Sequence, residues 1–203
     1  MAELPARYPV SLEIDYPDVL DKFTTFFRLF MAIPILIILG LLMAGNERAG
    51  IGYGVAWYVF FPTVLMLLFR HKYPRWWFDW NVALVSFAAR VASYLALLRD
   101  EYPSTDEEQA VHLQIPYPDV RNELNRWLPL VKWLLALPHY IILAVLGIVA
   151  LAAIVIAWFA ILVTSRYPRS LFDFVVGVLR WTLRVEAYAF LLTTDRYPPF
   201  SLD

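Results

Sequence analysis

The chain has 203 residues, of which 61% are hydrophobic and 17% aromatic, and its mean hydropathy is +0.58. Soluble domains hold roughly 45–50% apolar residues, so this composition predicts an integral membrane protein. The net charge of −1 gives no reason to expect a nucleic-acid partner, and the absence of cysteine excludes disulfides, thiolate metal sites and cysteine nucleophiles. Residues 1–7 have no apolar stretch behind basic residues, so we expect no cleavable signal peptide.

Two short segments alternate between apolar and polar residues, as half-buried strands do. They are residues 10–16 and residues 111–117, and both lead into the sequence Tyr-Pro-Asp-Val. Because an isolated pair of strands is only marginally stable, we expect the two to pair with each other or with a partner chain. Pro116 lacks an N–H group, which places the second strand at a sheet edge.

The next segment, residues 18–31, spaces aromatic residues at helical intervals among charged ones and is typical of an amphipathic helix entry. Asp18 and Asp119, each after a Tyr-Pro pair, are expected N-caps. Residues 29–44 then form an uncharged run of about 24 Å of helix, against a hydrocarbon core of roughly 30 Å. Residues 51–69 form a longer uncharged run that we expect to span a bilayer.

Residues 133–165 carry no formal charge and as one helix would measure about 50 Å, too long for one upright span and short for two. The interval from Pro34 to Tyr73 is 39 residues, whereas that from Pro138 to Tyr167 is 29. A turn absorbs the difference easily, whereas a continuous helix would be lengthened by about 15 Å. We therefore expect a membrane hairpin of two helices in each half of the chain.

Much of the sequence occurs twice. Residues 166–198, with two Tyr-Pro pairs and an Arg/Asp-flanked helical stretch, resemble residues 72–103 at an offset of 94 to 95 residues. We predict a tandem duplication, with one membrane repeat in residues 1–103 and a second in residues 104–203.

The third segment of each repeat, about residues 76–98 and 170–192, gathers its polar side chains on one sector of a helical wheel. A charged residue at mid-bilayer costs at least about 2.5–3.5 kcal/mol, so Arg180 and Arg184 on one face favour an amphipathic helix at the membrane interface. The alternative is a third span whose polar face packs against protein. The fold class we expect is all-α integral membrane with short β-strands.

Orientation follows from the cationic residues. In the hairpin arrangement ten of them lie on one side of the membrane and only Arg48 on the other. The positive-inside rule makes that side, with both termini, cytoplasmic. The two repeats then point the same way, as parallel repeats.

Several motifs carry a resemblance to a known family. They are Phe-Phe-Arg-Leu from Phe26, Arg-Tyr-Pro-Arg from Arg166 and Asp-Arg-Tyr-Pro-Pro-Phe from Asp195. The chain resembles the bacterial membrane family catalogued as domain of unknown function 4389, over both repeats and most specifically at residues 166–200. The first repeat departs from the pattern at Ser86, where the second has an arginine. The resemblance implies a multi-pass protein of the bacterial cytoplasmic (inner) membrane and brings no established activity.

Basic residues beside aromatic ones mark candidate contacts with lipid headgroups. Trp76, Trp77 and Trp80 lie among cations, as in the aromatic belt of an interface. In so apolar a chain, phosphate groups of lipids are better ligands for these cations than nucleic acid. The predicted headgroup-binding residues are Arg70, Lys72, Arg75, Arg90, Arg166, Arg169, Arg180 and Arg184.

Glu186 lies on the side of the third helix that should be apolar, opposite Arg180 and Arg184. A carboxylate there has a raised pKa unless it is paired. It is either the partner of a cation such as Lys132 or Arg28, a residue wetted at the interface, or a carboxylate that handles protons or cations.

No pattern for a metal, cofactor or catalytic site is present. The histidines His71, His112 and His139 lack ligand spacing, and we expect His139 to be hydrogen-bonded within a bundle rather than to bind haem or a metal. Phosphate loops and nucleophile elbows are missing from the sequence. Residues 50–54 have a GxxxG spacing that serves either a helix contact or a flexible loop.

These features predict a non-catalytic inner-membrane protein. It would be an accessory or membrane-organising subunit that binds lipid or a protein partner, as a homo-oligomer or as part of a larger membrane complex. The alternative is a small oligomeric channel or transporter, although the expected spans offer few polar groups beyond Thr63, His139 and Tyr140. An enzyme is the least favoured class.

Overall fold

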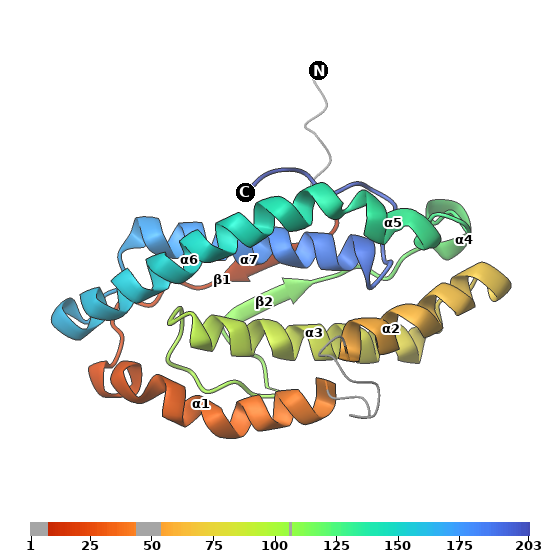
Figure 1. Ribbon diagram of the computed structural model, residues 1–203. Helices are drawn as coiled ribbons and strands as arrows, with labels where there is room; N and C mark the ends of the chain where they lie inside the picture. Colours follow the sequence, from red (N-terminus) through yellow and green to blue (C-terminus); the bar gives the residue numbers. More distant parts are fainter. Residues whose placement is uncertain (1–7, 44–53, 106) are drawn as a thin grey trace, which may run out of the picture.

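The computed structural model describes residues 8–43, 54–105 and 107–203. It is mostly helical, with one short two-stranded sheet that lies between two of the long helices (Figure 1). The expected turn after the first apolar run, Arg48 and most of the GxxxG stretch lie outside the described residues. In chain order the elements are β1 (Ser11–Ile14), α1 (Lys22–Met43), α2 (Gly54–Leu65), the π-helix η2 (Met66–Arg70), α3 (Arg75–Leu95), β2 (Val111–Gln114), α4 (Val120–Glu123), α5 (Pro129–Leu135), α6 (Leu137–Thr164) and α7 (Arg169–Ala189).

The two strands pair with each other, as the alternation predicts. They are antiparallel, with Leu12 opposite Leu113 and Ile14 opposite Val111. Each strand packs against the amphipathic helix of the other half of the chain: β1 lies on α7, and β2 lies on α3. The two halves are therefore joined through exchanged strands.

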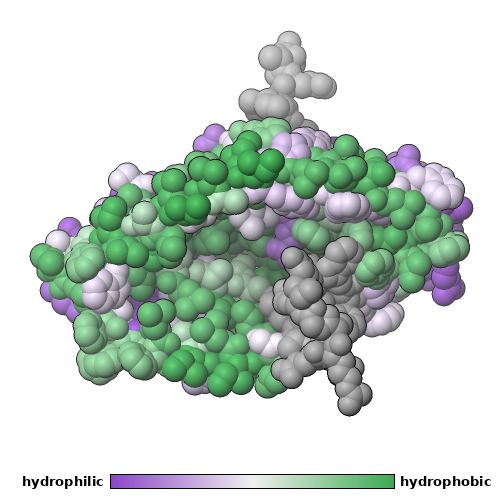
Figure 2. Space-filling view, viewed as in Figure 1, coloured by the Kyte–Doolittle hydropathy of each residue, from purple (hydrophilic) through white to green (hydrophobic). Residues whose placement is uncertain are grey.

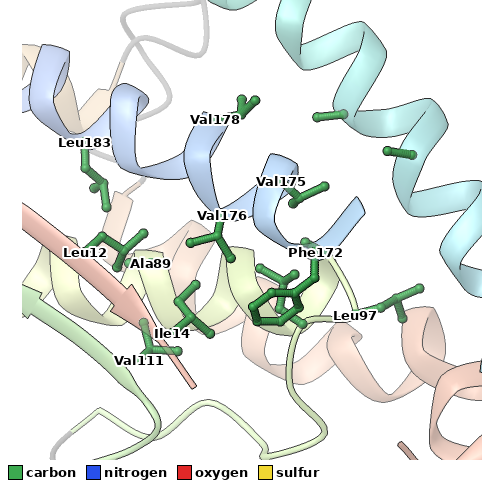
Figure 3. Packing of buried hydrophobic residues seen from close by; sticks show 14 of the residues in the cluster. Leu12, Ile14, Ala89, Leu97, Val111, Phe172, Val175, Val176, Val178 and Leu183 are labelled. Carbon is green, nitrogen blue, oxygen red and sulfur yellow. The ribbon is translucent and has the colours of Figure 1, made fainter. Parts of the chain in front are cut away.

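The main core lies where this sheet meets the helices. Leu12 and Ile14 of β1 point toward Val176 and Leu183 of α7, with Ala89 of α3 close by (Figure 3). These apolar side chains come from both halves of the chain and form a single buried cluster. Burial of apolar surface at about 25 cal/mol per Å² is what holds the short strands in place.

α6 is one continuous helix, so the predicted hairpin in the second half is wrong. Nothing in the helix interior stops it: Gly147 is the one glycine there, and a glycine in a helix costs only about 1 kcal/mol relative to alanine. Small residues at Ala150, Ala153 and Ala157 are buried against α7, which runs alongside α6 (Figure 1). The interval from Pro138 to Tyr167 is ten residues shorter than its counterpart in the first half, and it lacks the residues that a turn would need.

In the first half the two expected helices are present as α1 and α2. Figure 1 shows α2 leading away from the end of α1 rather than returning along it, so the expected side-by-side hairpin is absent here too. The start of α1 instead lies against the end of α6. There the indole of Trp158 donates a hydrogen bond to the carbonyl of Thr25 at 3.2 Å, and Lys22 reaches the carbonyl of Val163 at 3.0 Å.

The helix starts fit the capping prediction at one of two places. Asp119 caps α4 by accepting from the backbone N–H groups of Arg121 and Asn122, as expected. α1 is capped by Asp21 rather than Asp18, with the backbone N of Thr24 at 2.7 Å from its carboxylate. The cap is displaced because Leu20 is buried and its N–H bonds to the carbonyl of Ser165, which keeps the chain from entering a helix earlier.

Two helices, α1 and α6, are long and apolar enough to cross a membrane. Their most apolar windows have mean hydropathies of 2.3 and 3.0, yet only 22% and 17% of those windows is buried inside the protein. The core helix of a soluble protein would be mostly buried. These two helices instead expose apolar side chains along their length.

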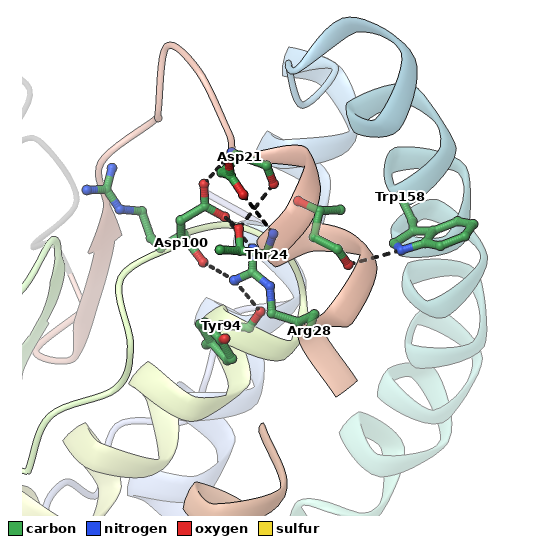
Figure 4. Close-up of polar contacts among 8 residues, drawn as sticks. Asp21, Thr24, Arg28, Tyr94, Asp100 and Trp158 are labelled. Atoms are coloured by element: carbon green, nitrogen blue, oxygen red, sulfur yellow. Dashed lines mark hydrogen bonds and ion pairs between the residues drawn. The ribbon is translucent and has the colours of Figure 1, made fainter. Parts of the chain in front are cut away.

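A buried arginine ties α1 to the end of α3. Arg28 is 2% exposed and forms an ion pair with Asp100 (Figure 4). Its guanidinium also donates to the carbonyls of Tyr94, at 3.3 Å, and Arg99, and lies 4.2 Å from the centre of the Tyr94 ring. Asp100 in turn accepts from the backbone N of Asp21, so it also holds the start of α1.

The same set of contacts occurs at Lys132, which lies 104 residues after Arg28. Lys132 is fully buried, 2.6 Å from Asp195 and 2.7 Å from the carbonyl of Thr194, with its amine 5.2 Å from the centre of the Tyr188 ring. Asp195 accepts from the backbone N of Asn125 at 2.6 Å. Each pair therefore fixes the end of α3 or α7 to the start of the helical segment that carries the cation.

Removing one carboxylate from these pairs should destabilise the fold strongly, because a buried cation is then left without its partner. We expect Asp195→Asn and Asp100→Asn each to lower the free energy of unfolding by about 3–5 kcal/mol. Asp173→Asn is the matched control, because its ion pair with Arg169 is exposed and should contribute less than about 1 kcal/mol. Unfolding in detergent micelles measures all three, and equal losses would contradict the anchoring role.

Candidate functional site

One exposed cation of the second half is built into the turn between α6 and α7. Tyr167 is buried, and its carbonyl accepts a hydrogen bond from the hydroxyl of Tyr16, 2.5 Å away. The guanidinium of Arg169 lies 4.6 Å from the centre of the Tyr16 ring and 3.1 Å from Asp173. Ser165, just before, adopts a left-handed backbone with φ of 59°, which turns the chain out of α6.

The turn into α3 has the same arrangement. The hydroxyl of Tyr117 donates to the carbonyl of Tyr73, and Arg75 lies 4.8 Å from the centre of the Tyr117 ring and 3.1 Å from Asp79. His71 has the left-handed backbone here, with φ of 45°. We call residues 72–75 and 166–169 the two Tyr-Pro-Arg corners. Each is held by a tyrosine that follows the strand of the other half.

The eight predicted headgroup-binding cations divide into two groups. Five are exposed at or beside the corners, where their charges are accessible. The other three are partly or fully buried, and hydrogen bonds to backbone carbonyls engage Arg90 and Arg180 within the protein. The exposed group is Arg70, Lys72, Arg75, Arg166 and Arg169, and the internal group is Arg90, Arg180 and Arg184.

The two internal cations of α7 contact residues near the two ends of the described chain. Arg180 donates to the carbonyls of Leu12, at 2.9 Å, and Leu202, at 3.1 Å. Arg184 is buried, 5.9 Å from the centre of the Tyr8 ring. A Cβ atom added at Gly177 would lie 2.8 Å from that of Leu202, so the residue must be small. The polar sector of α7 is therefore covered by protein.

His139 is a packing residue with one hydrogen bond, as expected. It is buried, its Nδ1 accepts from the indole of Trp181 at 3.0 Å, and its ring stacks on Phe200 with centres 4.1 Å apart. No group of three potential metal-ligating side chains occurs in the part of the chain that the structure describes.

Glu186 lines a cavity between α7 and α3. Among the described residues no hydrogen bond or ion pair reaches its carboxylate, and the two cations expected to pair with it, Lys132 and Arg28, pair with Asp195 and Asp100 instead. Burial raises the pKa of Glu186 to about 7. The carboxylate is thus protonated in part at neutral pH.

Sequence reasoning missed the small residues opposite Glu186. Ala88, Ala89 and Ala92 of α3 line the same cavity. The cluster of alanines was visible in the sequence, but only the packing of α3 against α7 shows that it faces an acid.

Comparison with known proteins identifies one family for part of the chain. The model of the family described as Domain of unknown function (DUF4389) matches residues 127–201. This stretch contains α5, α6, α7, the second Tyr-Pro-Arg corner and Asp195. The match supports the family resemblance for the second half of the chain. No curated protein and no solved structure matches the chain.

Glu186→Gln should stabilise the protein at neutral and alkaline pH. Because the folded-state pKa of about 7 exceeds the ordinary value of 4.5, the wild-type protein should lose stability as pH rises from 4.5 to 7 and then stay level. The glutamine variant lacks this loss, so at about pH 8 it should be the more stable by at most about 3 kcal/mol. Thermal unfolding across this range, with the exposed Glu108→Gln as control, measures the difference.

If Glu186→Gln were less stable than wild type at every pH, the carboxylate would have a structural partner, contrary to the structure.

Proposed function

We propose that the protein is a non-catalytic membrane protein of two related halves, which lies along the inner-membrane surface and holds anionic lipid headgroups at its Tyr-Pro-Arg corners. In this role it serves as an accessory or organising component of the bacterial cytoplasmic membrane. The observation that carries the proposal is the pair of long apolar helix faces on α1 and α6, which border the exposed cations.

The apolar faces are too large for a surface in contact with water. Leu41 of α1 is 73% exposed and Ile148 of α6 is 72% exposed, and each belongs to a row of exposed apolar residues at helical spacing. Figure 2 shows these hydrophobic residues gathered along the upper and lower helices of one face. Continuous apolar patches of this kind mark membrane or protein contacts.

Recurring contacts support the two related halves. The corners, the left-handed turns before them and the buried cation pairs each occur twice, 94 to 104 residues apart. In the sheet, Leu12 lies opposite Leu113, which is its counterpart in the other half. Pairing of equivalent residues in antiparallel strands is the arrangement expected around an approximate two-fold axis.

The continuous α6 bears on orientation. Its 28 residues extend over about 42 Å, and exposed cations flank both ends, with Arg126 before α5 and Arg166 after α6. A helix across the membrane would put these cations on opposite sides. If α6 lies along the membrane, both cations reach the same headgroup layer, as the positive-inside rule favours.

The polar neighbours of α6 favour the same orientation. α7 runs alongside α6, and β1 packs on α7, so a crossing α6 would bring both toward the hydrocarbon. Asp15, just after β1, is 66% exposed. A charge at mid-bilayer costs at least about 2.5–3.5 kcal/mol, whereas a helix in the interface leaves such groups in water.

The corners suit anionic headgroups. Arg75 and Arg169 each lie against a tyrosine ring with an exposed aspartate on the same helix, and exposed ion pairs of this kind contribute little. A lipid phosphate can therefore displace the aspartate at small cost, while the ring keeps the guanidinium in place. Trp76, exposed beside the first corner, adds an interfacial aromatic side chain.

Single cysteines at the two ends of α5–α6 and at the start of α7 test the orientation, since the natural chain has none. We expect Asn125→Cys and Ser170→Cys to be protected alike from an impermeant thiol reagent in intact cells, and labelled alike after permeabilisation. Labelling of one of them alone in intact cells would show that α6 crosses the membrane and would overturn the in-plane orientation.

Lipid binding is tested at the second corner. Replacing Arg166 and Arg169 with Gln should remove two surface cations, each contributing on the order of 1 kcal/mol, and so reduce co-purifying anionic lipid several-fold in native nanodiscs. The matched variant with Lys at both positions keeps the charges and should retain most of the lipid. Mass spectrometry of the lipids measures the change, and equal lipid content in all three proteins would contradict headgroup binding.

A further inference from the structure

The cavity that Glu186 lines is formed by two helices and a strand. It has a volume of about 160 Å³ and lies between α3 and α7, with Leu12 of β1 as a further wall. Figure 3 shows Leu12, Ala89 and Leu183 grouped where β1, α3 and α7 meet. In Figure 2 the surface is hollowed between the upper and lower helices, the region that α3 and α7 occupy in Figure 1.

The two helices present corresponding positions to this cavity. Every lining residue of α7 lies 94 residues after a lining residue of α3. The side chains are unequal, because α3 offers alanines where α7 offers larger groups. Ala88, Ala89 and Ala92 are the counterparts of Thr182, Leu183 and Glu186. The small residues on α3 leave space, and α7 supplies the one charged group among the lining residues. The charge of the site therefore lies on the α7 side alone.

From this arrangement we propose that the cavity binds a small organic cation, a primary ammonium group on a short hydrocarbon chain. The ammonium group pairs with the Glu186 carboxylate, and the hydrocarbon lies against the alanines, Val85 and Leu179. A cavity of about 150 Å³ accommodates a molecule the size of benzene, which sets the scale of the ligand.

The lining favours an alkylammonium ion over a metal ion. Ca²⁺ needs six to eight oxygen ligands and Mg²⁺ six, whereas the side chains that line this cavity contain three oxygen atoms in all, those of Glu186 and Thr182. An ammonium group has three N–H donors, which these three oxygens can accept. The hydroxyl of Thr182 donates to the carbonyl of Val178 at 2.8 Å, so its lone pairs remain oriented as acceptors.

No other charge competes for the ligand. α3 presents Val85 and three alanines, β1 presents Leu12, and α7 presents Leu179, Thr182 and Leu183 beside the acid, so Glu186 is the one titratable group among the lining residues. Binding should therefore follow the ionisation of a single carboxylate. Below pH 7 it should weaken by up to tenfold per pH unit.

The experiment titrates n-butylammonium into the full-length protein in nanodiscs at about pH 8.5, where Glu186 is ionised and an alkylamine is still protonated. Calorimetry should show saturable binding to wild type, at least tenfold weaker binding to Glu186→Gln, and weak binding of the neutral isostere n-butanol. Ala92→Leu keeps the acid but fills the cavity, and it too should lose binding. Glu108→Gln changes an exposed residue that does not line the cavity, and this variant should bind as wild type does.

Several results would overturn the site. These are absence of saturable binding to wild type, equal binding to Glu186→Gln, butanol binding as tightly as butylammonium, or undiminished binding to Ala92→Leu. Thermal unfolding of each variant establishes that it is folded. Loss of anionic lipid at the Tyr-Pro-Arg corners would leave all of these results unchanged, so the cavity and the proposed lipid contacts fail separately.

Discussion

Two buried cation–carboxylate pairs fix the relative positions of the helices. Arg28 with Asp100 and Lys132 with Asp195 join the start of an apolar segment to the end of the amphipathic helix of the same half. The two cations are buried, so each depends on its carboxylate and on nearby carbonyls. Because the ends of α3 and α7 are held in this way, these two helices can receive the strands, and the apolar faces of α1 and α6 are left outward.

The sequence was most informative where a local pattern decides the structure. The strands followed from alternation alone, and the third helices followed from helical periodicity, because both patterns require only that one face be buried. Their pairing with each other was one of two options that the sequence allowed. Which half each strand would contact was not visible, because exchange between halves leaves every local pattern unchanged.

It was least informative where a uniform stretch offers no boundary. Residues 133–165 contain apolar side chains throughout, and nothing local distinguishes a turn from a continuing helix; packing against α7 decided it. The wheel placed Arg180 and Arg184 on one face, but could not show that Leu12 and Leu202 provide carbonyls for Arg180 there. Glu186 was recognised as an acid on an apolar face. Its lack of a partner could not be predicted, because the two candidate cations, Lys132 and Arg28, pair with the distant residues Asp195 and Asp100.

The exchanged strands also affect how the chain can fold during synthesis. β1 pairs with residues that follow it by about 100 positions. At roughly 5–20 residues per second, several seconds pass before its partner has been made, and the apolar residues of α1 emerge during that time. The early chain must be shielded by the membrane or by chaperones, because its own sheet cannot yet close. The sheet therefore cannot form until β2, in the second half of the chain, has been synthesised.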